Sequence, residues 1–524
     1  MKRLMLILIA LLLVTLVTAA MAEGDAADAG QVKYKFTVLE DGTAMLTSCS
    51  ANGIEILELP ETVTDSEGTT YTVTRLAADL FVDAAVICIP DSVTVSAEEG
   101  LQNIAFAYEF RVSDTHPTMA VIDGVLFNKT ERSLIRYPMK KEAAGYTIPE
   151  GVAAIAPYAF SGYSKLSVLT IPDSLMSVGH NAFFNSGIKT FNISASNPVL
   201  AVEAGVLYDK RERALITVLT DIVPVFSIPE GIERIEDYAF NYNKVIKTLH
   251  LPSTLRSIGK DAFYQSSLEE IQFNEGLEHI GYEAFFSTKI VEVTLPTSLT
   301  EIGERAFAAN SLLTDVIIPE GCAATIGIQC FSTSSIETIT IPSSISEIGT
   351  FCFAYNENLK EAVLLCPLES LPAIFYRCRS LEKVSLPDSL QTIELNAFYL
   401  CESLSHIELP AELKSIEVNA FRDCKSLKEL YLPVSITDIS SGAFSGVDDI
   451  VFSVEHNSNA EALCIKYGWS YVSEGEADLS ANIPDWLKAA EETFPTHCPE
   501  CNYTLPEACD YNYCPMCGAE LRGN

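Results

Sequence analysis

The sequence predicts a repeat β-solenoid, a stack of similar coils that each contain a short strand plus a helical turn, with inserted β-hairpins and a small separate module at the C-terminal end. Two observations carry this prediction. The pattern apolar-x-x-apolar-x-apolar-Pro recurs along the chain, and in most units an Ala-Phe pair follows it. The phenylalanines lie 22 to 24 residues apart, except for one gap after Phe183. They are Phe160, Phe183, Phe240, Phe263, Phe285, Phe307, Phe331, Phe353, Phe375, Phe398, Phe421 and Phe444.

One unit shows why this pattern favours a solenoid. Residues 384–386 alternate between apolar and polar, so they form a short strand that directs Val384 and Leu386 inward. Pro387 ends the strand because it has no amide hydrogen to donate. The spaced apolar residues that lead to Ala397-Phe398 predict a turn of helix, in which Phe fills the interior. A unit of about 23 residues cannot bury its apolar face alone, so the coils must stack around one continuous core.

Stacked strands would place one outward side chain of each coil side by side, in what we call the outward strand column. Its varied chemistry suits the recognition of a partner, and the aromatic Tyr431 is a reasonable anchor. Threonine-rich strands also satisfy plain β-propensity, so the column does not by itself define a binding site. Its members are Thr170, His250, Gln272, Thr294, Ile317, Thr340, Ser385, Glu408 and Tyr431.

The full motif, Ile-Pro-x-Ser-Leu-x-x-Ile-Gly-x-x-Ala-Phe, closely resembles the BspA-type bacterial leucine-rich repeat. The resemblance extends from Leu59 to Phe444, and Leu295-Pro-Thr-Ser-Leu-Thr-Glu-Ile-Gly303 keeps nearly the whole pattern. The unit at 359–375 departs from it, because Cys366-Pro367 shifts the proline and the residue before its Phe is not Ala. The resemblance implies a surface or secreted protein that interacts with host matrix proteins or with other cells.

A longer repetition occupies the N-terminal half of the chain. Gly124-Val-Leu-Phe-Asn-Lys129 recurs 81 residues later as Gly205-Val-Leu-Tyr-Asp-Lys210. Each copy predicts a β-hairpin, one inserted near 119–145 and the other near 199–226, and these insertions explain the gap after Phe183. Inserted hairpins can serve as binding protrusions, but within a duplicated block they are more often part of the architecture.

The first residues predict export. Lys2 and Arg3 precede an apolar run at 4–17, and Ala20-Met21-Ala22 has the small-x-small pattern of a signal-peptide cleavage site. We therefore expect the mature chain to begin at Glu23. The apolar run is short for a membrane span, and acidic and polar residues follow it directly, so no membrane insertion is expected after cleavage.

Both ends of a solenoid must be covered, because bare terminal coils expose the core and the strand edges. Alternating Tyr34, Phe36 and Val38 predict a strand of an N-terminal cap. At the other end, 457–467 with Gly468 after it predicts a short closing helix. The predicted domains are a signal peptide at 1–22, the N-terminal cap at 23–57, the repeats at 58–450, the C-terminal cap at 451–473, a linker with a short helix at 474–496, and a zinc ribbon at 497–523.

The zinc ribbon is predicted from two CxxC pairs separated by twelve residues. This spacing suits one tetrahedral Zn²⁺ held by four thiolates, here in a structural role. Disulfide pairing is the alternative that export permits, although disulfides inside CxxC pairs would be strained. The four predicted ligands are Cys498, Cys501, Cys514 and Cys517.

Five other cysteines follow the repeat. Cys378, Cys401 and Cys424 each lie three residues after the core Phe, and Cys330 and Cys352 replace the Ala before it. We expect them to be buried, because a free cysteine packs like a small apolar side chain. A buried thiol without a charged neighbour is chemically inert, so no catalytic or redox role is expected for them.

Charge and missing motifs narrow the function. The formal charge of −36 would repel a phosphate backbone and an anionic membrane, so no nucleic acid is expected as a partner. The sequence has no HExxH motif, no Gly-x-Ser-x-Gly elbow and no phosphate-binding glycine loop. We expect a secreted or cell-surface protein that binds other proteins in adhesion and is not an enzyme. A passive envelope scaffold and an undetected secreted hydrolase are the competing hypotheses.

Overall fold

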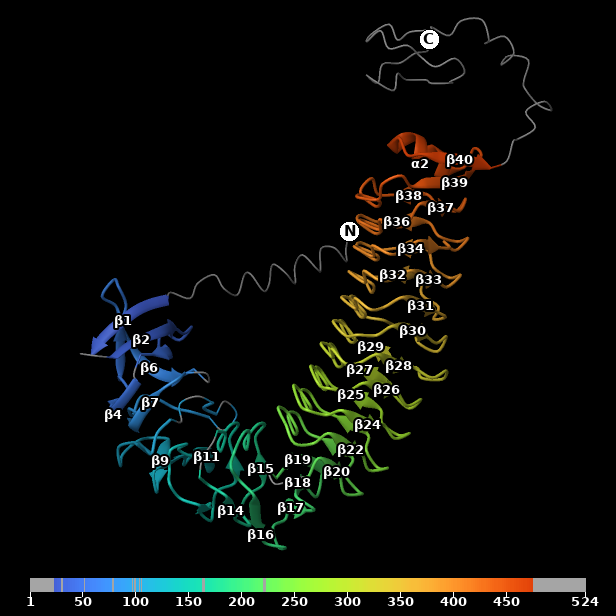
Figure 1. Cartoon of the computed structure of the whole chain (residues 1–524). Helices are drawn as coiled ribbons and strands as arrows, with labels where there is room; N and C mark the ends of the chain where they lie inside the picture. Colours follow the sequence, from blue (N-terminus) through green and yellow to red (C-terminus); the bar gives the residue numbers. More distant parts are fainter. Residues whose placement is uncertain are drawn as a thin grey trace, which may run out of the picture.

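The computed structural model describes residues 23–474 except 30–31, 51, 78–79, 97, 99, 103, 105, 163–164 and 220–222. The described chain forms a long arc of stacked coils (Figure 1). The predicted signal peptide, the segment 475–496 and the predicted zinc ribbon lie outside the described residues.

Each regular coil contributes two short strands, and each strand pairs in parallel with its counterpart in the next coil. Val384 of one coil, for example, lies beside Ala362 of the coil before it. The first strands of the coils are β4 (Asn52–Glu58), β7 (Asp83–Cys88), β8 (Glu109–Arg111), β12 (Gly145–Thr147), β14 (Val168–Ile171), β16 (Thr190–Ile193), β20 (Val225–Ser227), β22 (Thr248–His250), β24 (Glu270–Gln272), β26 (Glu292–Thr294), β28 (Asp315–Ile317), β30 (Thr338–Ile341), β31 (Glu361–Leu364), β33 (Lys383–Ser385), β35 (His406–Ile407) and β37 (Glu429–Tyr431), and β39 (Val451–Glu455) and β40 (Tyr471–Glu474) extend this row.

The second strands occupy the region where the sequence predicted a helical turn. They are β13 (Ala154–Ile155), β15 (Ser177–Val178), β21 (Arg234–Ile235), β23 (Ser257–Ile258), β25 (His279–Ile280), β27 (Glu301–Ile302), β29 (Thr325–Ile326), β32 (Ser370–Leu371), β34 (Thr392–Ile393), β36 (Ser415–Ile416) and β38 (Asp438–Ile439).

The prediction of a helical turn in each coil is therefore wrong. Each second strand is followed by tight turns, and the residues two before and two after the core Phe have positive φ in most coils. Around Phe398 these are Asn396, at φ 61°, and Leu400, at φ 59°. A right-handed helix cannot pass through left-handed residues at this spacing. The apolar spacing correctly predicted which residues are buried. It did not identify the backbone conformation, because a two-residue strand followed by two tight turns gives the same spacing as a helical turn.

The two predicted hairpins form part of the second-strand row. The first consists of β9 (Met119–Ile122), β10 (Val125–Asn128) and β11 (Ser133–Arg136), and the second of β17 (Leu200–Glu203), β18 (Val206–Asp209) and β19 (Ala214–Val218). Within each hairpin the strands are antiparallel, and its last strand pairs in parallel with the next second strand, β13 or β21. The hairpins thus start new stretches of the row. They also lie where the buried side chains divide into three core clusters.

The N-terminal cap is a five-stranded sheet of β1 (Glu23–Ala29), β2 (Val32–Val38), β3 (Ala44–Cys49), β6 (Thr70–Leu76) and β5 (Thr62–Thr64). Tyr34 and Phe36 of β2 are buried beneath it, as their alternation predicts. The range predicted as the cap already contains the first solenoid strand, since β4 pairs with β7. The cap sheet conversely takes β5 and β6 from the range predicted as repeats.

Helix α2 (Asn459–Tyr467) closes the C-terminal end. Its N-cap, Ser458, accepts a hydrogen bond from the Glu461 amide, and the Glu461 carboxylate accepts one from the Asn457 amide. Gly468 ends the helix in the left-handed conformation, at φ 70°. The helix therefore lies where the sequence indicated it.

From Phe240 to Phe444 the interior contains an unbroken stack of the core phenylalanines. Phe263 and Phe285 lie 4.9 Å apart between ring centroids and are tilted by 4°, and Phe307 and Phe331 continue the stack at 5.4 Å. The coils also approach closely at a column of glycines that follows the second strands. A Cβ atom added to Gly303 would lie 2.6 Å from the Gly281 carbonyl carbon. This contact explains the Gly of the repeat motif in physical terms.

Candidate functional site

The structure places the predicted outward strand column on the exposed face of the first strands. Eight of its nine members are exposed, and Thr170 is half-buried. Parallel pairing sets His250 beside Gln272 and Thr294 beside Ile317. The first strands that carry the column belong to several sheets, so the column is divided between β16 and β20, β24 and β26, β28 and β30, and β35 and β37.

A second exposed surface was not predicted. It consists of the turns from three residues before to two residues after each core Phe, which we call the inner turn face. These turns line the inner side of the arc (Figure 1). The curvature brings distant coils together there, since Gln102, Asp261 and Glu283 border one hollow of about 260 Å³.

The inner turn face contains large apolar side chains that remain 37 to 49% exposed. They occupy only two positions of the turn, three before or two after the core Phe. In the same coils the phenylalanines themselves are buried. The exposed residues are Tyr242, Tyr282, Ile328, Tyr355, Leu395 and Val418.

Aromatic rings on this face stack from coil to coil, with basic side chains between them. Tyr264 and Phe286 are parallel at 5.1 Å, and Tyr376 and Tyr399 at 4.9 Å. The Lys260 ammonium lies 5.3 Å from the Tyr282 ring centroid, within the range of a cation–π contact. This arrangement keeps the rings rigid, which favours binding because little conformational entropy remains to be lost.

One carboxyl group of the face has an unusual pKa. Asp261 is buried against the Glu283 carboxylate of the next coil. Burial and the neighbouring negative charge raise the pKa of Asp261 to about 6. Glu283 is in turn paired with Arg305, at 2.5 Å. We interpret this row of acid, acid and base as a structural link between three coils.

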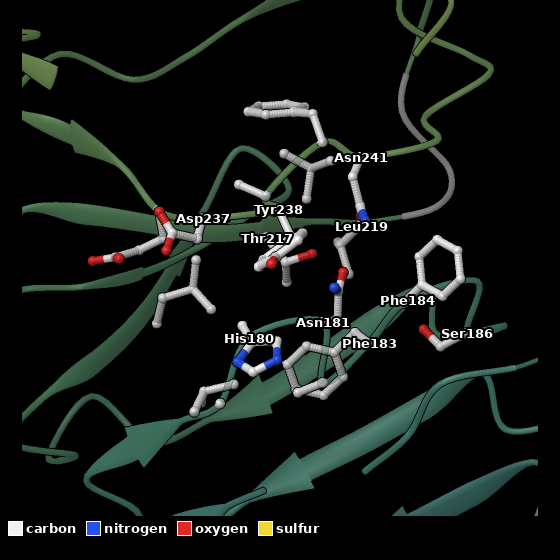
Figure 2. Close-up of a pocket in the computed structure, with 18 of the residues that line it drawn as sticks. His180, Asn181, Phe183, Phe184, Ser186, Thr217, Leu219, Asp237, Tyr238 and Asn241 are labelled. Atoms are coloured by element: carbon white, nitrogen blue, oxygen red, sulfur yellow. The ribbon is translucent and has the colours of Figure 1, made fainter. Parts of the chain in front are cut away.

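A cavity of about 690 Å³ opens where the second hairpin interrupts the stack. One wall is the turn at 179–187, the opposite wall is the turn at 237–245, and β19 contributes Thr217 and Val218. Figure 2 shows His180, Asn181 and Phe183 facing this space from one side and Asp237, Tyr238 and Asn241 from the other. The rings of His180 and Tyr238 bridge the two turns at 5.3 Å.

This cavity, which we call the junction gap, lacks the hydrogen bonds that join other neighbouring turns. At the next pair of coils, the amides of Tyr238, Phe240 and Tyr242 donate to three carbonyls of the following turn. Across the junction gap the described residues form no corresponding bond. The amides that lack this partner are those of Asn181, Phe183 and Asn185, and the opposing carbonyls are those of Asp237, Ala239 and Asn241.

The described part of the chain offers no metal centre, since it contains no group of three or more His, Cys, Asp or Glu side chains placed to hold an ion. The four predicted zinc ligands lie outside the described residues. Cys378, Cys401 and Cys424 are fully buried thiols, as expected, and burial raises their pKa values, that of Cys378 to about 12. Each thiol also donates to a Phe carbonyl of an earlier coil, which the sequence did not predict.

A stack of short parallel coils around a core of Leu, Ile and Phe defines the class of leucine-rich-repeat solenoids. Within this class, the BspA type leucine rich repeat region matches residues 140–204, 233–360 and 368–462 in six copies. These ranges make up more than half of the chain, and the protein belongs to this family. No curated protein is significantly similar to the chain in sequence.

Several solved structures of leucine-rich-repeat proteins are similar to this chain. A leucine-rich repeat protein from Bacteroides ovatus is 19% identical, with a TM-score of 0.38, over 86% of this chain and 100% of its own. A leucine rich cell surface protein from Faecalibacterium prausnitzii is 17% identical, with a TM-score of 0.35, over 84% and 97%. The pneumococcal vaccine antigen PcpA is 17% identical, with a TM-score of 0.32, over 86% and 99%.

Sequence reasoning missed the inner turn face because it treated the Ala-Phe region as a helix with one buried side. A signal was present in the residue after the core Phe, which is aromatic in Phe184, Tyr264, Phe286, Tyr376 and Tyr399. Two consecutive aromatic residues do not both point into the core, so the second one indicates a side chain that faces solvent or a partner.

Proposed function

We propose that this protein is a secreted or cell-surface adhesion protein that binds other proteins through its inner turn face. The observation that supports this most directly is the row of large apolar side chains left exposed on that face. Rows of exposed apolar residues with polar neighbours are typical of protein-binding surfaces. The partners we propose are proteins of the host extracellular matrix or of other cell surfaces.

A further observation supports export. Residues 1–22 have the sequence pattern of a cleaved signal peptide. Among the described residues, none of the helices has the length and apolar content required to cross a membrane. We propose that the protein acts by binding alone.

The decisive experiment compares charge insertion on two surfaces. Leu395 and Val418 are adjacent on the inner turn face, and Val434 is equally exposed on the turn that follows a first strand. The variant Leu395→Glu with Val418→Glu should bind immobilised matrix proteins and intact cells about tenfold more weakly than wild type, whereas Val434→Glu should bind normally. Equal binding by all three proteins would contradict the proposed surface.

The same assay tests the outward strand column. Tyr431→Ala should leave binding unchanged if the inner turn face forms the contact. A loss confined to Tyr431→Ala would instead assign binding to the column. If the wild-type protein binds neither matrix nor cells, the passive scaffold is favoured, and turnover in a glycosidase and peptidase screen would favour the hydrolase.

We also propose that Cys498, Cys501, Cys514 and Cys517 hold one structural Zn²⁺. The support is the CxxC spacing, together with the scarcity of large apolar residues in 497–523, which are too few to stabilise a fold of this size. Metal binding would then supply the free energy of folding. Elemental analysis should find about one zinc ion per chain in the wild-type protein and no bound zinc in the Cys514→Ser variant. Native disulfides between these cysteines, without metal, would contradict the proposal.

A further inference from the structure

The duplicated hairpins offer a direct comparison for the junction gap. The first hairpin lies between the turn that contains Gln102 and the turn that contains Phe160, just as the second lies between the turns of Phe183 and Phe240. At the first junction the chain fills the space between the turns with its own residues. Arg136 is fully buried there, and its guanidinium donates to the Gln102 carbonyl, the Ser161 carbonyl and the Ser161 hydroxyl.

The next residue completes this closure. The Tyr137 amide donates to the Ala159 carbonyl at 2.8 Å, so two carbonyls of the second turn are satisfied by residues of the hairpin. Burial lowers the pKa of Arg136 to about 9, which still leaves the guanidinium charged at neutral pH. A buried cation is thus tolerated at this position when carbonyl oxygens surround it.

The second hairpin leaves the corresponding space open for two reasons. With the same offset of 81 residues, Arg136 corresponds to Thr217, whose side chain is too short to cross the gap. Tyr137 corresponds to Val218, which pairs with Val206 of β18. Strand β19 also continues one residue further against β18, so that the Leu219 amide donates to Gly205. The strand therefore does not turn into the gap as the first hairpin does.

The acceptors that Arg136 and Tyr137 use at the first junction have counterparts in the gap. The segment Ile148-Pro-Glu-Gly151 recurs as Ile228-Pro-Glu-Gly231, so Ala159 and Ser161 correspond to Ala239 and Asn241. The carbonyls of Ala239 and Asn241 accept no backbone hydrogen bond within the described part of the chain.

Other groups of the gap add to this acceptor set. The Asn181 Oδ1 atom is buried and has no hydrogen-bond partner within the described residues. Asp237 also lines the gap, although its carboxylate already accepts a hydrogen bond from the Lys260 amide at 2.7 Å, and Asp209 and Glu236 are paired with Arg211 and Arg234. The Tyr238 ring offers an aromatic surface beside these oxygens. On the opposite wall, the amides of Asn181, Phe183 and Asn185 are available to donate.

We propose that the junction gap binds an extended peptide segment of a partner protein that carries an arginine side chain, in the position that Arg136 and Tyr137 occupy at the first hairpin. The guanidinium would donate to the Asn241 carbonyl, the counterpart of the Ser161 carbonyl that Arg136 uses, and the peptide carbonyls would accept from the amides of the opposite wall. An arginine-bearing partner also suits a chain with a formal charge of −36. The inference rests on the proposed protein-binding function and names a partner chemistry for it.

The probe for the test is the acetylated and amidated peptide Ser-Leu-Ile-Arg-Tyr-Pro, which copies residues 133–138. Its control replaces the arginine with glutamine. Titration calorimetry on the mature full-length chain should show about tenfold tighter binding of the arginine peptide, because charged hydrogen bonds are lost in the control. Equal affinities for the two peptides, or no binding of either, would overturn the inference.

Two protein variants locate the site. Thr217→Arg recreates the side chain of the first hairpin and should weaken peptide binding at least about tenfold, whereas Thr294→Arg, on the outward strand column, should not. Hydrogen exchange on wild-type protein provides a readout that does not depend on a variant. The amides of Asn181, Phe183 and Asn185 should become protected when the peptide binds, and unchanged exchange there would overturn the inference.

The outcomes separate this inference from the proposed function. If Thr217→Arg and wild type bind matrix proteins equally while neither binds the peptide, the inference fails and the adhesion function stands. If the peptide binds as expected but the double variant Leu395→Glu with Val418→Glu binds matrix proteins normally, the junction gap is confirmed as a peptide site. The inner turn face is then contradicted as the surface that binds matrix proteins.

Discussion

The coils around Phe307 and the coils around Phe398 solve the same packing problem with different chemistry. In both regions, the residue three after the core Phe is fully buried and donates to a Phe carbonyl of an earlier coil. At Asn310 this residue is an amide, which donates to the carbonyls of Phe285 and Phe307 and accepts from the amide and hydroxyl of Thr288. At Cys401 it is a thiol, which donates to the Phe375 carbonyl.

The two regions also differ at the residue after the second strand. In the coils of the first region this residue is Gly, as in Gly281 and Gly303, and the neighbouring backbones approach closely. In the later coils it is Glu394 or Glu417. The difference shows that stacked phenylalanines are common to both regions, whereas hydrogen bonding and close approach differ between them. The following predictions test that distinction.

The largest effect is expected from removing a ring of the common stack. Phe307→Ala should destabilise the protein by about 3 to 5 kcal/mol, because it removes buried surface and leaves a cavity between covered coils. Phe398→Ala should cost a similar amount, since its ring is equally buried and stacked. Chemical denaturation would measure both, and a midpoint within error of wild type for either variant would contradict the common stack. A second transition would show that one weak coil splits the cooperative unit.

The next largest effect should distinguish the amide from the thiol. Asn310→Ala should cost about 3 kcal/mol, since it leaves Thr288 and two carbonyls without their buried partner. Cys401→Ala should cost only about 1 kcal/mol, because a single weak hydrogen bond and one sulfur atom are lost. Thermal unfolding of the two variants under identical conditions measures the difference. Equal losses would show that burial alone determines stability at this position.

A smaller effect is expected at the close backbone approach. Gly303→Ala should destabilise by about 1 to 3 kcal/mol, because its Cβ atom would overlap the backbone of the preceding coil. Glu394→Ala, at the same position of a later coil, should cost no more than about 1 kcal/mol, because it removes only the hydrogen bond that the Ser370 hydroxyl donates to this carboxylate. Urea denaturation of the pair would test this, and a tolerated Ala at 303 would show that the early coils can separate.

The smallest effect concerns pH. Burial raises the pKa values of Cys378, Cys401 and Cys424 in the folded protein, that of Cys378 to about 12, while unfolded thiols titrate near about 8.5. The folded state therefore keeps protons that the unfolded state loses, and stability should fall as pH rises above about 8.5. A variant with serine at all three positions should lose less stability between pH 8 and pH 10, as measured by denaturation midpoints. Cys330 and Cys352 remain in both proteins, so their contribution cancels. A triple variant with the same pH dependence as wild type would contradict the assigned burial.

Several features could be predicted from the sequence because they depend on local periodicity. The alternation of Val384 and Leu386 identified the first strand, and Gly468 identified the end of helix α2. Prediction failed at the turns, where apolar spacing alone could not distinguish a helical turn from a two-residue strand with left-handed residues on either side of Phe398. Those residues adopt this conformation because stacking of neighbouring coils supports it.

The sequence by itself determined the repeat length, the inward positions, the place of the hairpins and the family resemblance, since each is a pattern along one chain. Only the tertiary structure decided which outward positions gather on the inner turn face and which hairpin closes its junction. The gap near Tyr238 depends on the direction that strand β19 takes after Thr217 and on the facing turns of two coils more than fifty residues apart. Contacts between such distant segments follow from packing, because local sequence determines how a segment folds and not which segment it will meet.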